Sequence, residues 1–183
     1  VITASGCGNE FGRIEAANGV AFGVLAGSLS GTGAINNNQF ESIKAMGFWV
    51  INGFSAYAQG VYVETMEARS RISGNQFNAD IEAADNAYGI STNDVNGTIG
   101  CAENETGNCG NTFEGAISSE GEAYGVSTGA LTSTARISGN VFKDEIKVGG
   151  GGFAAGISTN DVDGSIGCAE NETGNCGNTF EGA

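Results

Sequence analysis

The cysteines carry the most distinctive chemistry in this sequence. Cys101 and Cys109 bracket the nine residues CAENETGNC, and Cys168 and Cys176 bracket the same nine residues again. Paired thiols at this spacing can form a disulfide or bind a metal ion. The chain has no histidine, and each pair belongs to a different copy of a repeat, which disfavours zinc. The sequence therefore predicts two disulfides, Cys101–Cys109 and Cys168–Cys176, and a compartment outside the cytosol.

A fifth cysteine, Cys7, precedes Gly8 and Asn9 as Cys109 precedes Gly110 and Asn111. We interpret Cys7 as the closing half of another such loop. The sequence also ends in the middle of a repeat, after GNTFEGA. Both observations favour a segment of a longer array.

Two stretches place oxygen-bearing side chains at the spacing of an EF-hand calcium loop, with glycine in the sixth place. The candidate calcium ligands are Asp94, Asn96, Glu103, Asp161, Asp163 and Glu170. The first place holds threonine instead of aspartate, and Asp-x-Asn-Gly is also an ordinary turn sequence. Calcium is thus one interpretation and a plain turn is the other. No other cofactor is expected.

Catalytic groups are harder to nominate. Arg71 and Arg136 occupy equivalent places before an isoleucine, which favours a repeat feature over a catalytic pair. The sequence offers no set of nucleophile and base and no glycine-rich phosphate loop. We expect a protein that is not an enzyme. The alternative is a carbohydrate-binding or carbohydrate-active protein.

Composition limits the partners. Aspartate and glutamate number 21 against 7 lysines and arginines, for a formal charge of -14, which disfavours nucleic acids and anionic lipid surfaces. No apolar run approaches the roughly 20 residues that span a bilayer. Hydrophobic residues make up 40% of the chain, enough for a core, and 32 glycines without proline favour short strands joined by tight turns.

The elements that position these groups follow from internal repetition. The stretch 87–116 returns at 154–183 with three substitutions, and beneath it an Asn-x-Phe triplet recurs every 29 to 38 residues. The triplets contain Asn9, Asn38, Asn75, Asn111, Asn140 and Asn178, with Phe11, Phe40, Phe77, Phe113, Phe142 and Phe180. An isoleucine, a Gly-[Ile/Val] pair and a second isoleucine follow most of them. This pattern predicts an all-β fold, a right-handed parallel β-helix of about six coils with three short strands per coil.

Residues 1–183 therefore form one β-solenoid array. We expect the phenylalanines to stack inside it and the asparagines to form a ladder at a corner, where their amides bond to neighbouring coils and their backbones adopt left-handed angles.

Three insertions interrupt the coils, at 44–59, 101–109 and 168–176. The last two replace the Ile-Ser-Gly-Asn of plain coils, and the predicted disulfides would close their bases. The first is rich in aromatic residues. Phe48, Trp49, Phe54 and Tyr57 form a candidate binding patch for sugar rings or protein, or a flap that covers apolar surface.

Two surface features remain open. The Ser-Thr pairs at 91–92, 127–128 and 158–159 stack hydroxyls over three coils, either as an ice-binding face or as ordinary wall residues. Asn96, Asn104 and Asn171 lie in glycosylation sequons, of which the last two fall in the cysteine-bounded loops.

Repeats of the form I-x-G-N-x-F-x-x-x-I with A-Y-G-[IV] resemble the parallel β-helix stalks of bacterial surface and secreted proteins, including autotransporter passengers and polymorphic outer-membrane proteins. The resemblance covers nearly the whole chain. It implies an extracellular or cell-surface rod that serves adhesion, display or assembly. Its partners would be neighbouring copies, other surface proteins or glycans, and a homopolymer is one form of such assembly.

Overall fold

We describe the computed structural model over residues 8–47, 55–168, 172 and 174–182. These residues form nineteen strands in three sheets, and every strand pairing is parallel. Each coil contributes to all three sheets, so the predicted parallel β-helix is confirmed. No helix long and apolar enough to cross a membrane occurs among these residues.

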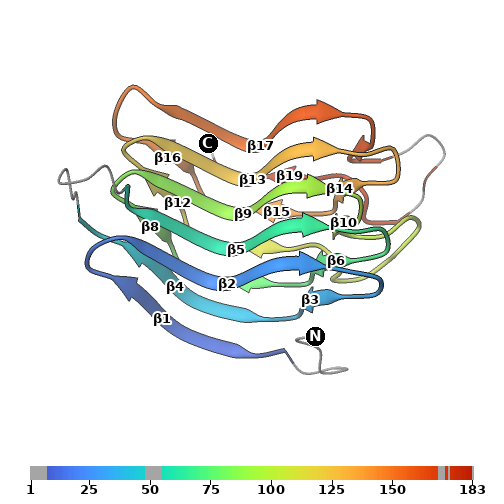
Figure 1. The fold of residues 1–183 in the computed structure, drawn as a ribbon, viewed down its shortest axis with the longest axis horizontal. Helices are drawn as coiled ribbons and strands as arrows, with labels where there is room; N and C mark the ends of the chain where they lie inside the picture. The colour runs from blue at the N-terminus through green and yellow to red at the C-terminus, as the bar shows by residue number, and fades with distance from the viewer. Residues whose placement is uncertain (1–7, 48–54, 169–171, 173, 183) are drawn as a thin grey trace.

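The first sheet, called here the long-strand sheet, holds a ten-residue strand from each of five coils. They are β2 (Val20–Leu29), β5 (Tyr57–Met66), β9 (Asn86–Val95), β13 (Glu122–Leu131) and β17 (Phe153–Val162). Figure 1 shows them stacked one above the next, each bent near its middle. These strands are longer than the sequence predicts, because parallel pairing with the neighbouring coil continues beyond the Gly-[Ile/Val] pair as far as Val95 and Leu131.

The second sheet, called the short-strand sheet, has one short strand per coil. Its strands are β3 (Ala34–Asn36), β6 (Arg71–Ser73), β10 (Thr98–Gly100), β14 (Arg136–Ser138) and β18 (Ser165–Ile166). The isoleucine of each strand pairs with the isoleucine of the next, from Ile35 to Ile166.

The third sheet, called the phenylalanine sheet, contains the Asn-x-Phe triplets. It consists of β1 (Glu10–Ala16), β4 (Gln39–Ala45), β7 (Gln76–Phe77), β8 (Ile81–Ala83), β11 (Thr112–Phe113), β12 (Ile117–Ser119), β15 (Val141–Phe142), β16 (Ile146–Val148) and β19 (Thr179–Phe180). Phe40 pairs with Phe77, and Ile43 pairs with Ile81. The sequence separation between the two isoleucines is one residue longer than that between the two phenylalanines. The extra residue leaves the ladder, and this divides the later strands in two.

The six phenylalanines form one continuous stack inside the solenoid, as predicted. Successive ring centroids lie 4.6 to 4.9 Å apart, and the rings are within 8° of parallel. Phe40, Phe77, Phe113 and Phe142 are fully buried. Each such burial is worth about 1.5 to 3 kcal/mol relative to an exposed side chain.

The six asparagines form the predicted ladder. In one typical step, Asn111 Oδ1 accepts hydrogen bonds from the backbone N–H and the Nδ2 of Asn75, at 3.2 and 2.8 Å. Asn111 Nδ2 in turn donates to Ile72 O and to Asn140 Oδ1, both at 2.9 Å. The side-chain amide thus satisfies buried polar groups in both neighbouring coils.

The prediction of left-handed backbone at the ladder asparagines was wrong. Positive φ angles fall on the residue before them in the plain coils, at Asn37, Gly74 and Gly139, with φ of 58°, 64° and 67°. That preceding residue makes the corner. The ladder position is therefore asparagine for the hydrogen bonds of its amide alone.

A column of glycines faces the phenylalanine stack across the interior, and the sequence analysis did not connect the two. A Cβ atom at Gly125 would lie 2.2 Å from Phe142 Cε1 and 2.5 Å from the carbonyl oxygen of Gly156. Gly60 and Gly89 would meet the rings of Phe77 and Phe113 in the same way. Glycine is required here because any side chain would occupy the space of the ring.

Replacing Asn111 by alanine tests the ladder. Two donors of Asn75 lose their acceptor and Ile72 O loses a donor, so we expect the free energy of unfolding to fall by about 3 to 5 kcal/mol. Urea denaturation followed by circular dichroism measures the change. Asn93→Ala, on the exposed side of β9, is the control and should change stability by less than about 0.5 kcal/mol. Equal losses in both variants would contradict a special role for the ladder.

Replacing Gly125 by alanine tests the glycine column. The added methyl overlaps the ring of Phe142, and overpacking of this kind costs about 1 to 3 kcal/mol. Gly27→Ala is the matched control, because nothing lies within 4 Å of a Cβ at this surface position of the same sheet. Thermal unfolding should separate the two, and a Gly125→Ala protein as stable as the Gly27→Ala protein would refute the packing argument.

Candidate functional site

The two cysteine-bounded insertions are closed by the predicted disulfides. Cys101 is bonded to Cys109, and Cys168 to Cys176, with Cα separations of 4.8 and 4.7 Å. We call residues 101–109 and 168–176 the stapled loops. Each leaves the short-strand sheet, after β10 or β18, and returns before β11 or β19 of the phenylalanine sheet. Cys7 lies outside the described residues.

The base of the first stapled loop belongs to the wall. Cys101 and Cys109 are buried. The N–H of Cys101 donates to Ser138 O at 2.9 Å, and Cys109 O accepts from the N–H of Gly74 at 2.9 Å. The loop is thus hydrogen-bonded to the coils on both sides of it, and the disulfide closes a segment whose ends are already fixed.

Each stapled loop is also clamped by an arginine from the plain coil before it. Arg71 Nη2 donates to Gly100 O at 3.1 Å and to Glu105 Oε2 at 2.6 Å. In the second copy, Arg136 Nη2 donates to Gly167 O at 3.2 Å and forms an ion pair with Glu172. In each copy, one guanidinium therefore bonds both to the glycine before the loop and to the glutamate in the middle of the loop.

The two clamps differ in burial. Arg136 and Glu172 have side chains that are 9% and 2% exposed, whereas Arg71 and Glu105 are about one-third exposed. Burial raises the pKa of the Glu105 carboxyl, but the N–H of Ala102 and the Arg71 guanidinium together hold that pKa below its usual value. Glu105 is charged at neutral pH, and its stabilising contribution is lost only as the pH falls through this lowered pKa.

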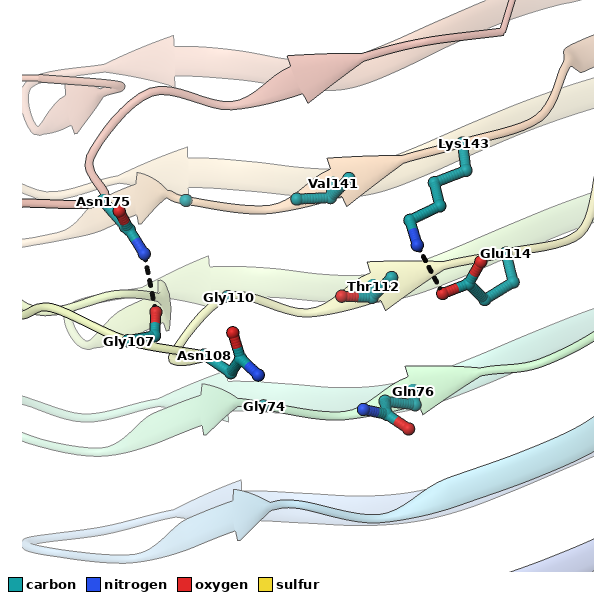
Figure 2. Close-up of a pocket in the computed structure, with 11 residues that line it drawn as sticks. Gly74, Gln76, Gly107, Asn108, Gly110, Thr112, Glu114, Val141, Lys143 and Asn175 are labelled. Atoms are coloured by element: carbon teal, nitrogen blue, oxygen red, sulfur yellow. Dashed lines mark hydrogen bonds and ion pairs between the residues drawn. The ribbon is translucent and has the colours of Figure 1, made fainter.

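The stapled loops touch each other although a plain coil separates their strands. Asn175 Nδ2 donates to Gly107 O at 2.6 Å, as Figure 2 shows, and the N–H of Asn175 donates to Glu105 O at 3.1 Å. The N–H of Asn104 donates to Glu172 Oε1 at 3.3 Å. The two loops therefore form one ridge along this side of the solenoid.

Four candidate calcium ligands, Asp94, Asn96, Asp161 and Asp163, lie in or next to the long strands β9 and β17. Asp94 is exposed near the end of β9, Asn96 accepts hydrogen bonds from Thr132 and Thr134, and β10 runs between Asn96 and Glu103. Asp161 lies in β17, with Asp163 just beyond it, and Glu170 is outside the described residues. Within the described ranges, no group of three or more Asp, Glu, His or Cys side chains is placed to hold a metal ion.

Residues 48–54 of the aromatic insertion, which include Phe48, Trp49 and Phe54, lie outside the described residues. At its two ends, Lys44 belongs to β4 and Tyr57 is the first residue of β5. The ring of Tyr57 stacks on that of Tyr88, with centroids 6.5 Å apart. Tyr57 is thus part of the long-strand sheet.

The serine-threonine column does not provide an exposed threonine face. Thr92 and Thr128 are buried and point inward, whereas the preceding serines, Ser91 and Ser127, are half-buried on the outer side. The alternation of the strand places the hydroxyls of each pair on opposite faces. The column therefore provides no flat array of exposed threonines over these coils.

Sequence reasoning missed the arginine clamps and the contact between the loops. The sequence does contain a signal for the clamps. Arg71 and Arg136 occupy equivalent positions in their coils, and so do Glu105 and Glu172 in the two CAENETGNC segments. Nothing in the sequence states that these positions meet, since 34 and 36 residues separate the partners.

Comparisons of this chain with protein-family models, with curated proteins and with solved structures found no match.

The buried clamp gives a direct test of loop anchoring. Arg136→Met leaves the Glu172 carboxylate buried without its cation, so we expect a loss of about 3 to 5 kcal/mol in unfolding free energy. Hydrogen exchange of residues 168–176 should accelerate as well. Arg13→Met is the control, because the Arg13 side chain is 70% exposed and such surface pairs contribute at most about 1 kcal/mol. Unchanged exchange in Arg136→Met would contradict the clamp.

Proposed function

We propose that this chain is part of an extracellular, non-catalytic rod that displays the stapled-loop ridge for adhesion. The observation that carries the proposal is that the two stapled loops are anchored at several points. Each is closed by a disulfide, clamped by an arginine and bonded to the other loop. A surface that is held at several points before binding loses less entropy when it binds.

The scaffold suits this role. The phenylalanine stack and the asparagine ladder run through the coils without interruption, so the wall is stiff and presents the loops at fixed spacing. Two copies of one loop on one rigid wall also favour multivalent attachment, in which the second contact follows the first at high effective concentration.

Two further observations support the compartment and the non-catalytic role. Two disulfides favour an oxidising environment, as on a cell surface or in secreted material. Arg71 and Arg136, the wall arginines that a catalytic site would draw on, are engaged with loop glutamates. The rod's partners would be surface proteins, glycans or neighbouring copies, and end-to-end assembly into fibres is compatible with the parallel coils.

A loop-excision variant tests the display function. Plain coils read Ile-Ser-Gly-Asn where stapled coils carry the insertion, so replacing residues 100–110 and 167–177 each by Ser-Gly converts stapled coils into plain ones. Microspheres coated with either protein are passed over collagen, fibronectin, mucin and epithelial cell layers. We expect the unaltered chain to retain at least several times more beads than the excised variant.

Circular dichroism provides the control for folding, since the excised variant should keep its β-sheet spectrum. Equal retention of the two proteins, or retention of the unaltered chain no greater than that of uncoated beads on every surface, would overturn the proposal.

A further inference from the structure

A groove of about 310 Å³ lies on the outer face of the phenylalanine sheet beside the first stapled loop. In Figure 2, Gly107 and Asn108 of the loop lie on one side, the ion pair of Glu114 and Lys143 lies on the other, and Thr112 lies between them. Asn175 of the second stapled loop lies at one end. The groove therefore depends on both loops and on three successive coils of wall.

Three polar side chains in the groove have unused hydrogen-bonding capacity. Gln76, Asn108 and Thr112 line it, and their side chains make no hydrogen bond within the described part of the chain. Two are amides and one is a hydroxyl, so each can both donate and accept. Gly110 and Gly139 also line the groove, where they contribute backbone atoms alone.

The groove is close to electrically neutral. Its charged lining residues are Glu114 and Lys143, whose side chains form an ion pair at 2.7 Å. The protein as a whole carries -14, which repels anionic ligands such as sulfated or uronic-acid chains. A ligand that suits both conditions has no charge and many hydroxyl groups.

A peptide fits this groove poorly. Extended peptides bind by adding a strand to a free sheet edge, but β11 is paired on both sides, with β7 and β15. Side-chain anchors need apolar pockets, and Val141 is the one apolar side chain among the lining residues. The free groups here are instead arranged to exchange hydrogen bonds with a small polyol.

We propose that this groove binds a short neutral saccharide, of one or two sugar units, through Gln76, Asn108 and Thr112. The inference names a ligand class for the surface that the proposed adhesive function displays, and it rests on that function. The duplication of the loop matters for this site. Asn175 of the second stapled loop donates a hydrogen bond to Gly107 of the first and forms one end of the groove.

A glycan array tests the saccharide site. The printed probes are neutral oligosaccharides of glucose, galactose, mannose and N-acetylglucosamine, together with sulfated and uronic-acid counterparts. We expect the chain to bind at least one neutral probe and to ignore the charged set. Thr112→Val and Asn108→Ala should each weaken that binding about fivefold to tenfold, the effect of one lost hydrogen bond.

Thr179→Val is the matched control. Thr179 stands at the place of Thr112 in the last coil and does not line the groove, so its substitution should leave binding unchanged. The proposal fails if no neutral probe binds at millimolar concentration, if only charged probes bind, or if Thr112→Val binds as well as the unaltered chain. If coated beads are retained but the glycan array shows no binding, the saccharide site alone is rejected. If the array shows binding but the beads are not retained, the adhesive function is rejected.

Discussion

The register of one coil upon the next is the constraint on which this structure depends, and the buried asparagine amide enforces it. Each ladder amide has its partners in the coils on either side, so a slip of one residue would leave several buried donors and acceptors without partners. The phenylalanine stack adds stability, but contact between stacked rings is less directional than a hydrogen bond. Hydrogen bonds have fixed partners, and they therefore decide which residue lies over which.

That constraint explains where the chain accepts extra residues. An insertion is tolerated only where the chain can leave the wall and return without disturbing the ladder. The stapled loops do this immediately before a ladder asparagine, and the single added residue between Phe77 and Ile81 does it by breaking a strand. Because the two stapled loops enter at the same place in their coils, they align on one side. The ridge of stapled loops is therefore a consequence of the register.

The sequence was sufficient to predict the solenoid, the phenylalanine stack, the asparagine ladder and both disulfides, because each depends on residues that recur at matched positions. The glycine column recurs too, but its reason lies across the interior, where Gly125 meets Phe142, and a linear pattern does not state which columns face each other. The pairing of Arg136 with Glu172 was hidden for the same reason. The periodicity of the sequence shows which residues stack in successive coils. Which stacks contact each other depends on the cross-sectional shape of the solenoid.

The surface charge and the rigid wall act on different aspects of recognition. Cross-coil ion pairs such as Lys44 with Glu82 are partly exposed, and pairs of this kind contribute little to stability. Acidic residues outnumber basic ones threefold, so there are too few cations to neutralise most of the carboxylates. The resulting field repels anionic chains over about 8 to 10 Å at moderate salt. Neutral ligands are not repelled, so the field selects the class of partner, and the clamped loops then determine which member of that class fits.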